Sequence, residues 1–159
     1  MAILRFGHLG ICVTSLAASV PFYRDLLGFR PLSRTDVRGA DADRLLGLQG
    51  VDQTSVFLER DNVRLALFEF RSPQSPAARP PRAMNELGMA AIMLRVDDIA
   101  STLEKMKSAG VHVLESTLTD YPEYGSRLVF VTDPDGTMIE LVEIPGDPFV
   151  PFGKPWNGD

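Results

Sequence analysis

The chain of 159 residues contains one structural pattern twice. Residues 8–13 and 91–96 each predict a short strand that ends in a polar turn, and residues with helical spacing follow each strand. A glycine, Gly28 or Gly110, ends each predicted helix. Three further strand-like segments follow in both copies, so each copy is predicted as strand, helix, strand, strand, strand. This repeat restricts the chain to two similar modules.

The end of each copy predicts a β-hairpin. Residues 56–58 and 64–70 form the first, and residues 129–131 and 138–144 form the second. Asp-Pro-Asp-Gly at 133–136 favours a tight turn, because proline presets φ and glycine accepts a positive φ. One module cannot bury both faces of its sheet alone. We therefore expect an α+β fold, in which two tandem βαβββ modules form a curved mixed sheet that lines a cleft, with the helices outside.

The same pattern sets the expected domain boundaries. Residues 1–70 form the first module and residues 88–145 the second. Residues 71–87 lack periodicity and are expected to be a linker. Residues 146–159 form a C-terminal tail with three aromatic residues, which we expect to pack on the protein, cover a cleft mouth or dock on a partner subunit.

Composition excludes several classes of function. The net charge of −5 argues against general binding to nucleic acid, which needs clustered Lys and Arg. A single cysteine, Cys12, permits neither a disulfide framework nor a thiolate metal site. The sequence has neither an apolar run of about 18 residues nor a signal-peptide pattern, so we expect a cytoplasmic protein without membrane segments.

Three motifs carry a resemblance to a known family. They are Gly-His-Leu-Gly at 7–10, the helix and turn at 19–29, and Asp-Pro-Asp-Gly-Thr-Met-Ile-Glu-Leu-Val-Glu at 133–143. Together with the tandem modules, they make the chain from Leu4 to Pro145 similar to the vicinal oxygen chelate superfamily. That superfamily includes glyoxalase I, methylmalonyl-CoA epimerase, extradiol dioxygenases, and fosfomycin- and bleomycin-resistance proteins.

The resemblance implies four positions that hold a metal in the metal-dependent members. These positions lie on the first and last strands of each module, and in this sequence they are occupied by His8, Ala66, Ala91 and Glu140. Glu69 aligns with Glu143 and falls on the opposite face of its strand, because side chains alternate along a strand.

Only His8 and Glu140 remain as candidate metal ligands, because the methyl groups of Ala66 and Ala91 cannot coordinate. We therefore expect no cofactor, while leaving open a weakly bound divalent metal. The same two residues are the candidate catalytic pair, since an imidazole and a carboxylate across a cleft can move a proton in an isomerase or a lyase.

Six further residues are candidates for contact with a substrate. Their predicted strand faces or their place in the loop at 120–127 would bring them to the cleft, and they are Arg64, Phe68, Met93, Arg95, Tyr124 and Arg127. A guanidinium can hold a carboxylate or phosphate. The alternatives are a core position for the apolar residues, a solvated strand end for the arginines at 64 and 95, and an ordinary surface loop for the last two.

Three functions remain open at this point. The first is an isomerase or lyase that uses His8 and Glu140 without a full metal site. The second is a metal-dependent enzyme of the glyoxalase, epimerase or dioxygenase type, and the third is a protein that binds a drug without chemistry, like the bleomycin-resistance proteins. All three imply a small-molecule partner, and the resemblance adds the expectation of a homodimer.

Overall fold

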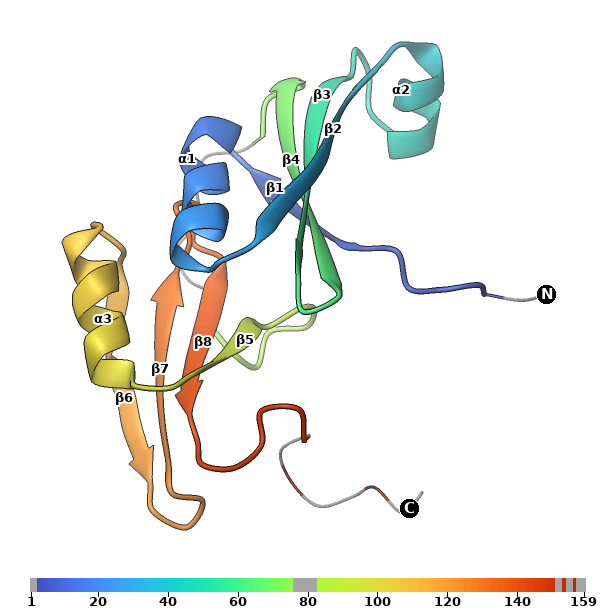
Figure 1. The fold of residues 1–159 in the computed structure, drawn as a ribbon. Helices are drawn as coiled ribbons and strands as arrows, with labels where there is room; N and C mark the ends of the chain where they lie inside the picture. Colours follow the sequence, from blue (N-terminus) through green and yellow to red (C-terminus); the bar gives the residue numbers. More distant parts are fainter. Residues whose placement is uncertain (1–2, 76–82, 151–152, 154–155, 157–159) are drawn as a thin grey trace. The chain divides into compact units, whose positions relative to one another are not determined.

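The computed structural model describes residues 3–75, 83–150, 153 and 156 (Figure 1). These residues fall into two compact units: the first precedes Ala83 and includes Asp133–Thr137, and the second comprises Ala83–Thr132 and the chain from Met138 onward. Each unit contains one four-stranded mixed sheet, with strand order β1-β4-β3-β2 in the first and β5-β8-β7-β6 in the second. The α+β class and the two modules are confirmed, and each module has a sheet of its own.

The elements follow the predicted order in both modules, with one additional helix in the first. The first contains β1 (Leu9–Val13), α1 (Leu16–Pro21), the π-helical turn η1 (Phe22–Leu26), β2 (Arg30–Arg38), α2 (Ala40–Leu46), β3 (Asp52–Arg60) and β4 (Val63–Ser72). The second contains β5 (Ile92–Val96), α3 (Ile99–Ser108), β6 (Val113–Tyr121), β7 (Ser126–Thr132) and β8 (Met138–Glu143). None of the helices in the described part of the chain is long and apolar enough to span a membrane.

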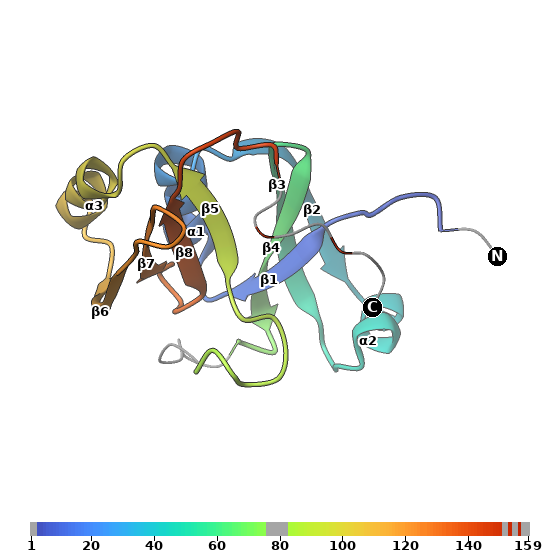
Figure 2. The same ribbon diagram turned by 90° about the horizontal axis from the view of Figure 1, so that it is seen from below.

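The helix α2 was not expected from the sequence. Figures 1 and 2 both show it beyond the ends of β2 and β3. Only Ala42 of this helix is buried, while Leu45 and Leu46 are exposed, so the segment has no apolar stripe of helical period. The carboxylate of Asp43 holds the segment after the helix, since it accepts hydrogen bonds from the amides of Gly50 and Val51.

The linker and the tail are described only in part. Of the expected linker at 71–87, residues 76–82 lie outside the described residues, and its first residues belong to the end of β4. Of the tail, residues 151–152, 154–155 and 157–159 lie outside them. The expected loop at 120–127 is shorter in the structure, because β6 continues to Tyr121 and β7 begins at Ser126.

The two modules share one strand register. In the first, Ala66 on β4 lies opposite Gly10 on β1 and Phe57 on β3. In the second, Glu140 on β8 lies opposite Met93 on β5 and Phe130 on β7. Ala66 and Glu140 therefore occupy the same place in their modules, as the sequence alignment predicts.

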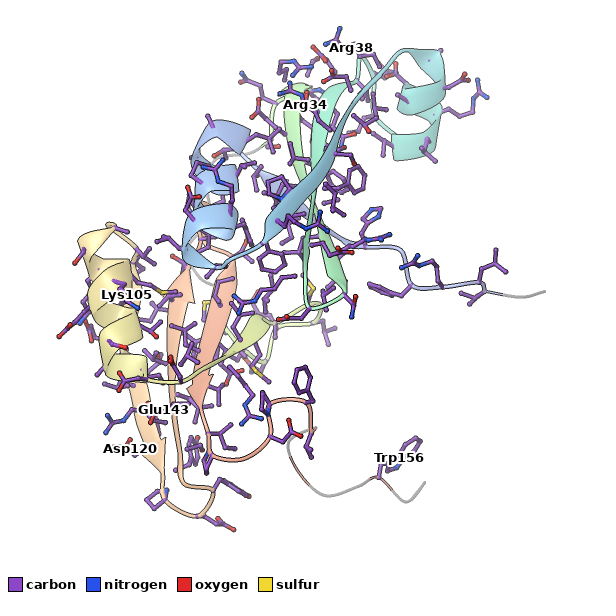
Figure 3. The ribbon with its side chains drawn as sticks, in the orientation of Figure 1. Arg34, Arg38, Lys105, Asp120, Glu143 and Trp156 are labelled. Carbon is purple, nitrogen blue, oxygen red and sulfur yellow. The ribbon has the colours of Figure 1, made fainter. Side chains whose placement is uncertain are left out.

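A carboxylate on the outer face of each sheet holds the start of the first helix in each module. Glu69 accepts a hydrogen bond from the backbone N–H of Leu16 at 2.6 Å, and Glu143 accepts one from the N–H of Ile99 at 2.8 Å. Figure 3 shows Glu143 close to the start of α3. Glu69 and Glu143 therefore lie on the sheet face that packs against the helix, as the alternation of side chains along a strand predicts.

The two helix starts differ in their own capping residues. Asp98 precedes α3 and accepts a hydrogen bond from the N–H of Ser101 at 2.6 Å. Ser15 stands at the corresponding position before α1, but its side chain makes no capping hydrogen bond. The carboxylate of Glu69 supplies an acceptor at this end of α1 instead.

A buried tyrosine fixes the Asp133–Thr137 turn within the first unit. The hydroxyl of Tyr23 donates to a carboxylate oxygen of Asp133 at 2.9 Å, and the Tyr23 side chain has no exposed surface. The other carboxylate oxygen of Asp133 accepts from the amides of Asp135 and Thr137. Burial and the charge of Asp133 raise the pKa of Tyr23 well above its usual range.

Tyr23→Phe is expected to lower the free energy of unfolding by about 1–3 kcal/mol, because the buried carboxylate of Asp133 loses one of its donors. Urea denaturation at neutral pH measures the change. Tyr121→Phe, on an exposed tyrosine at the end of β6, serves as the control and should leave stability unchanged. Equal effects of the two variants would show that the buried hydrogen bond does not stabilise the unit.

Glu143→Ala is expected to lower the free energy of unfolding by about 0.5–2 kcal/mol, because the first N–H of α3 loses its acceptor. Urea denaturation and helical circular dichroism measure the loss. Glu104→Ala removes an exposed carboxylate from the same helix and should have little effect. A Glu143→Ala protein as stable as its Glu104→Ala control would contradict this role.

Candidate active-site pocket

The second unit contains a pocket of 680 Å³ on the sheet face opposite α3. Met93 and Arg95 of β5 line it, together with Glu140 and Val142 of β8. Ile139 and Leu141, which alternate with these residues on β8, are buried on the other face. Alternation along two paired strands therefore delivers a carboxylate, a guanidinium and two apolar side chains to one cavity.

Glu140 is the acidic residue that the sheet itself contributes to the pocket. Its side chain is partly buried, and burial raises the pKa of its carboxyl group. No hydrogen bond or ion pair of this carboxylate occurs among residues 3–75, 83–150, 153 and 156. A carboxylate whose proton affinity is raised in this way is suited to accept a proton from a bound molecule.

Arg95 points its donors at the C-terminal segment. Its Nη2 donates to the carbonyl of Ile144 at 2.8 Å and its Nη1 to the carbonyl of Asp147 at 2.9 Å. Longer bonds reach the carbonyls of Pro145 and Gly146. The guanidinium therefore fastens the chain after β8, and residues 144–150 become one wall of the pocket.

Of the two substrate contacts predicted near the β6–β7 turn, only one lines the pocket. Tyr124, in the turn, lines the pocket. Arg127 is not among the lining residues, and its guanidinium forms an ion pair with Asp120 at 2.6 Å. Figure 3 shows Asp120 near the end of the β6–β7 hairpin.

His8 lies in the first unit, at the residue before β1. Its ring meets the rings of Phe57 and Phe68 edge to face, with centroids 5.1 and 6.2 Å apart respectively. The Phe68 ring also occupies the space where a Cβ at Gly10 would stand. His8 is thus placed beside two aromatic side chains at an exposed position.

Arg64 also lies in the first unit, on β4. Its guanidinium bonds to Glu59 at 3.0 Å, and Glu59 pairs in addition with Arg30 at 2.9 Å. These charges hold the neighbouring strands β2, β3 and β4 together at this point. The joint action of His8 and Glu140 stays a prediction, because the two residues belong to different units.

The donor set does not fit the metal site of the metal-dependent members. Ala66 is fully buried in the register position that Glu140 occupies in the second module, and its methyl group cannot coordinate. Ala91 likewise offers only a methyl group, at the position that matches His8, two residues before the equivalent positions Gly10 and Met93. Within the described ranges, no three His, Cys, Asp or Glu side chains lie close enough to hold a metal ion.

Sequence reasoning named no contact residue in the chain after β8, although covering a cleft mouth was one of the roles expected for the tail. Pro145, Pro148, Phe149 and Val150 line the pocket, although no periodic pattern marks this segment. Ser126 and Leu128 of β7 were also missed. Their spacing of two along a strand was the available signal, once the start of β7 is placed at Ser126.

Comparison with known proteins identifies the family. Residues 5–141 match the model of the Glyoxalase/Bleomycin resistance protein/Dioxygenase superfamily. The chain belongs to this superfamily.

Individual relatives of the superfamily resemble the chain over most of its length. A 2-epi-5-epi-valiolone epimerase from Actinomyces is 30% identical over 151 residues, which cover 89% of this chain and 81% of the relative. A crystal structure of a glyoxalase family protein from Bacillus cereus has a TM-score of 0.77 and 24% identity, and covers 92% of this chain and 97% of its own.

A trypanothione-dependent glyoxalase I from Leishmania major is also similar. It has a TM-score of 0.60 and 25% identity, and the match covers 86% of this chain and 84% of that one. The superfamily fold of both modules is thus shared by proteins of different activities, so the function has to be argued from the site.

Glu140→Gln is expected to become more stable relative to the parent protein as pH rises. The raised pKa of Glu140 means that the folded state binds this proton more tightly than the unfolded state, so the parent loses stability as pH rises through that pKa. The glutamine has no proton to lose. Urea denaturation between about pH 4 and pH 7 measures the difference.

Glu123→Gln, at an exposed position in the β6–β7 turn, is the matched control. It removes the same charge outside the pocket. A pH-dependent difference equal to that of Glu140→Gln would contradict an effect of burial at Glu140.

Proposed function

We propose that this protein is an isomerase of the epimerase type, which moves a proton at a carbon next to the carbonyl group of a small organic molecule. The observation that carries the proposal is the partly buried Glu140 carboxylate in a pocket of 680 Å³, with a raised pKa. A general base works best when its pKa approaches the working pH, and burial moves a carboxyl group in that direction.

The proposed reaction balances without an oxidant or a reductant. The Glu140 carboxylate takes the proton from the carbon next to the carbonyl, and the electron pair of the C–H bond moves to the carbonyl oxygen as an enolate forms. A proton delivered to the opposite face of this carbon restores the ketone with inverted configuration. Solvent water supplies this proton, and Glu140 releases to the solvent the proton that it took.

Two further observations support this choice. The Actinomyces relative at 30% identity carries the name of an epimerase. The donor set at the four ligand positions comprises one imidazole and one carboxylate, so no step of the proposal passes through a metal ion. The base is then a side chain of the protein itself.

Proton exchange in deuterated water tests the role of Glu140. The intact protein is incubated with 2-epi-5-epi-valiolone and with 2-phenylcyclohexanone, and NMR follows loss of the proton next to the carbonyl. We expect the parent to catalyse exchange, and Glu140→Gln to slow it by about 10²–10⁴-fold, the usual contribution of a general base. Glu123→Gln should keep the parent rate.

Full activity of Glu140→Gln would refute the assignment of this carboxylate as the base. A parent protein that binds these ketones but exchanges no proton would be a binding protein and not an isomerase.

A further inference from the structure

We infer that the Glu140 pocket selects neutral molecules with an apolar body and rejects anions. This inference rests on the pocket of the proposed function and adds the chemical class of its ligand. It depends on three features of the described lining residues: the walls that they form, the hydrogen bonds of their one cation, and the sign of their remaining charges.

The walls are formed mainly by apolar side chains. Met93, Leu128, Val142 and Phe149 line the pocket from β5, β7, β8 and the C-terminal segment. Phe149 is 90% exposed, so it presents an uncovered apolar surface beside the opening. Binding of an apolar body would remove such surface from water, which stabilises the complex by about 25 cal/mol per Å² of apolar area.

Among the lining residues that the structure describes, Arg95 is the only cation. Its guanidinium donates to four successive carbonyls, those of residues 144–147. An anion that took these donors would leave the carbonyls without them and release the segment that forms the wall. The geometry therefore makes Arg95 a positioning residue for the pocket wall and not a receptor for a carboxylate or a phosphate.

The other charged residues of the pocket are acidic. Glu140 lies on the sheet, and Asp147 follows it in the C-terminal segment, where its carboxylate accepts from the N–H of Phe149 at 2.9 Å. An anionic ligand would meet these negative charges, and the described part of the lining offers it no free cation to pair with. Desolvating an anion under such conditions is strongly unfavourable, whereas a neutral carbonyl compound avoids that penalty.

A matched pair of fluorescent probes tests the inference. N-phenyl-1-naphthylamine is neutral, and 8-anilinonaphthalene-1-sulfonate carries the same ring system with an added sulfonate. Each is titrated into the intact protein, and the rise in probe fluorescence gives the dissociation constant. We expect the neutral probe to bind at least about tenfold more tightly, a difference that corresponds to about 1.4 kcal/mol.

Leu128→Lys places a cation with free donors on the pocket wall. We expect it to weaken binding of the neutral probe and to tighten binding of the sulfonate, which removes the tenfold preference. Leu118→Lys is the control, because Leu118 is an exposed residue of β6 outside the pocket, and it should change neither constant. Tyr124→Lys, on the exposed turn, repeats the test if Leu128→Lys fails to fold.

Two results would overturn the inference. One is a sulfonate probe that binds the parent as tightly as the neutral probe. The other is a folded Leu128→Lys protein that binds both probes with the dissociation constants of the parent. That result would place the apolar ligand outside this pocket. Neither measurement uses turnover, so a protein that exchanges ketone protons but fails the probe test would refute this inference and leave the proposed reaction standing.

Discussion

The parallel pairing of the first and last strands within each module determines where every functional side chain points. In the first module β1 pairs with β4, and in the second β5 pairs with β8 in the same register. Because side chains alternate along a strand, this register sends Glu69 and Glu143 to the helix face and Ala66 and Glu140 to the opposite face. A shift of one residue would exchange the two faces and bring a helix-capping carboxylate to the pocket side.

The two modules have the same strand framework but carry different side chains at matching positions. On the first module, Phe68 lies against Gly10, and the rings of Phe57 and Phe68 stand beside His8. On the second, the positions that match Gly10 and Phe68 hold Met93 and Val142, which line the pocket with Glu140. The same strand positions therefore hold an aromatic ring packed over a glycine in the first module and two aliphatic side chains in the second.

The pocket also depends on a segment outside the repeat. Residues 144–150 have no counterpart in the module pattern, and the guanidinium of Arg95 holds the first four of them through backbone carbonyls. This arrangement gives Arg95 a different role from the one expected from the sequence. From the sequence, we expected Arg95 to bind an anion or to extend into solvent at a strand end. In the structure, its guanidinium donates hydrogen bonds to the protein's own backbone.

The sequence alone was sufficient to predict the repeat, the order of the elements along the chain, the helices α1 and α3, and the match of Ala66 with Glu140, because these follow from local periodicity and from comparing two copies of one pattern. It did not determine α2, whose leucines are exposed and whose end is held by Asp43, since such a helix has no apolar face to detect. The folded structure was needed to show that Arg95 bonds to the segment after β8, that Arg127 pairs with Asp120, and that Glu140 is partly buried in a pocket. Hydrogen-bond partners and burial depend on residues distant in the chain, and a local pattern carries no information about them.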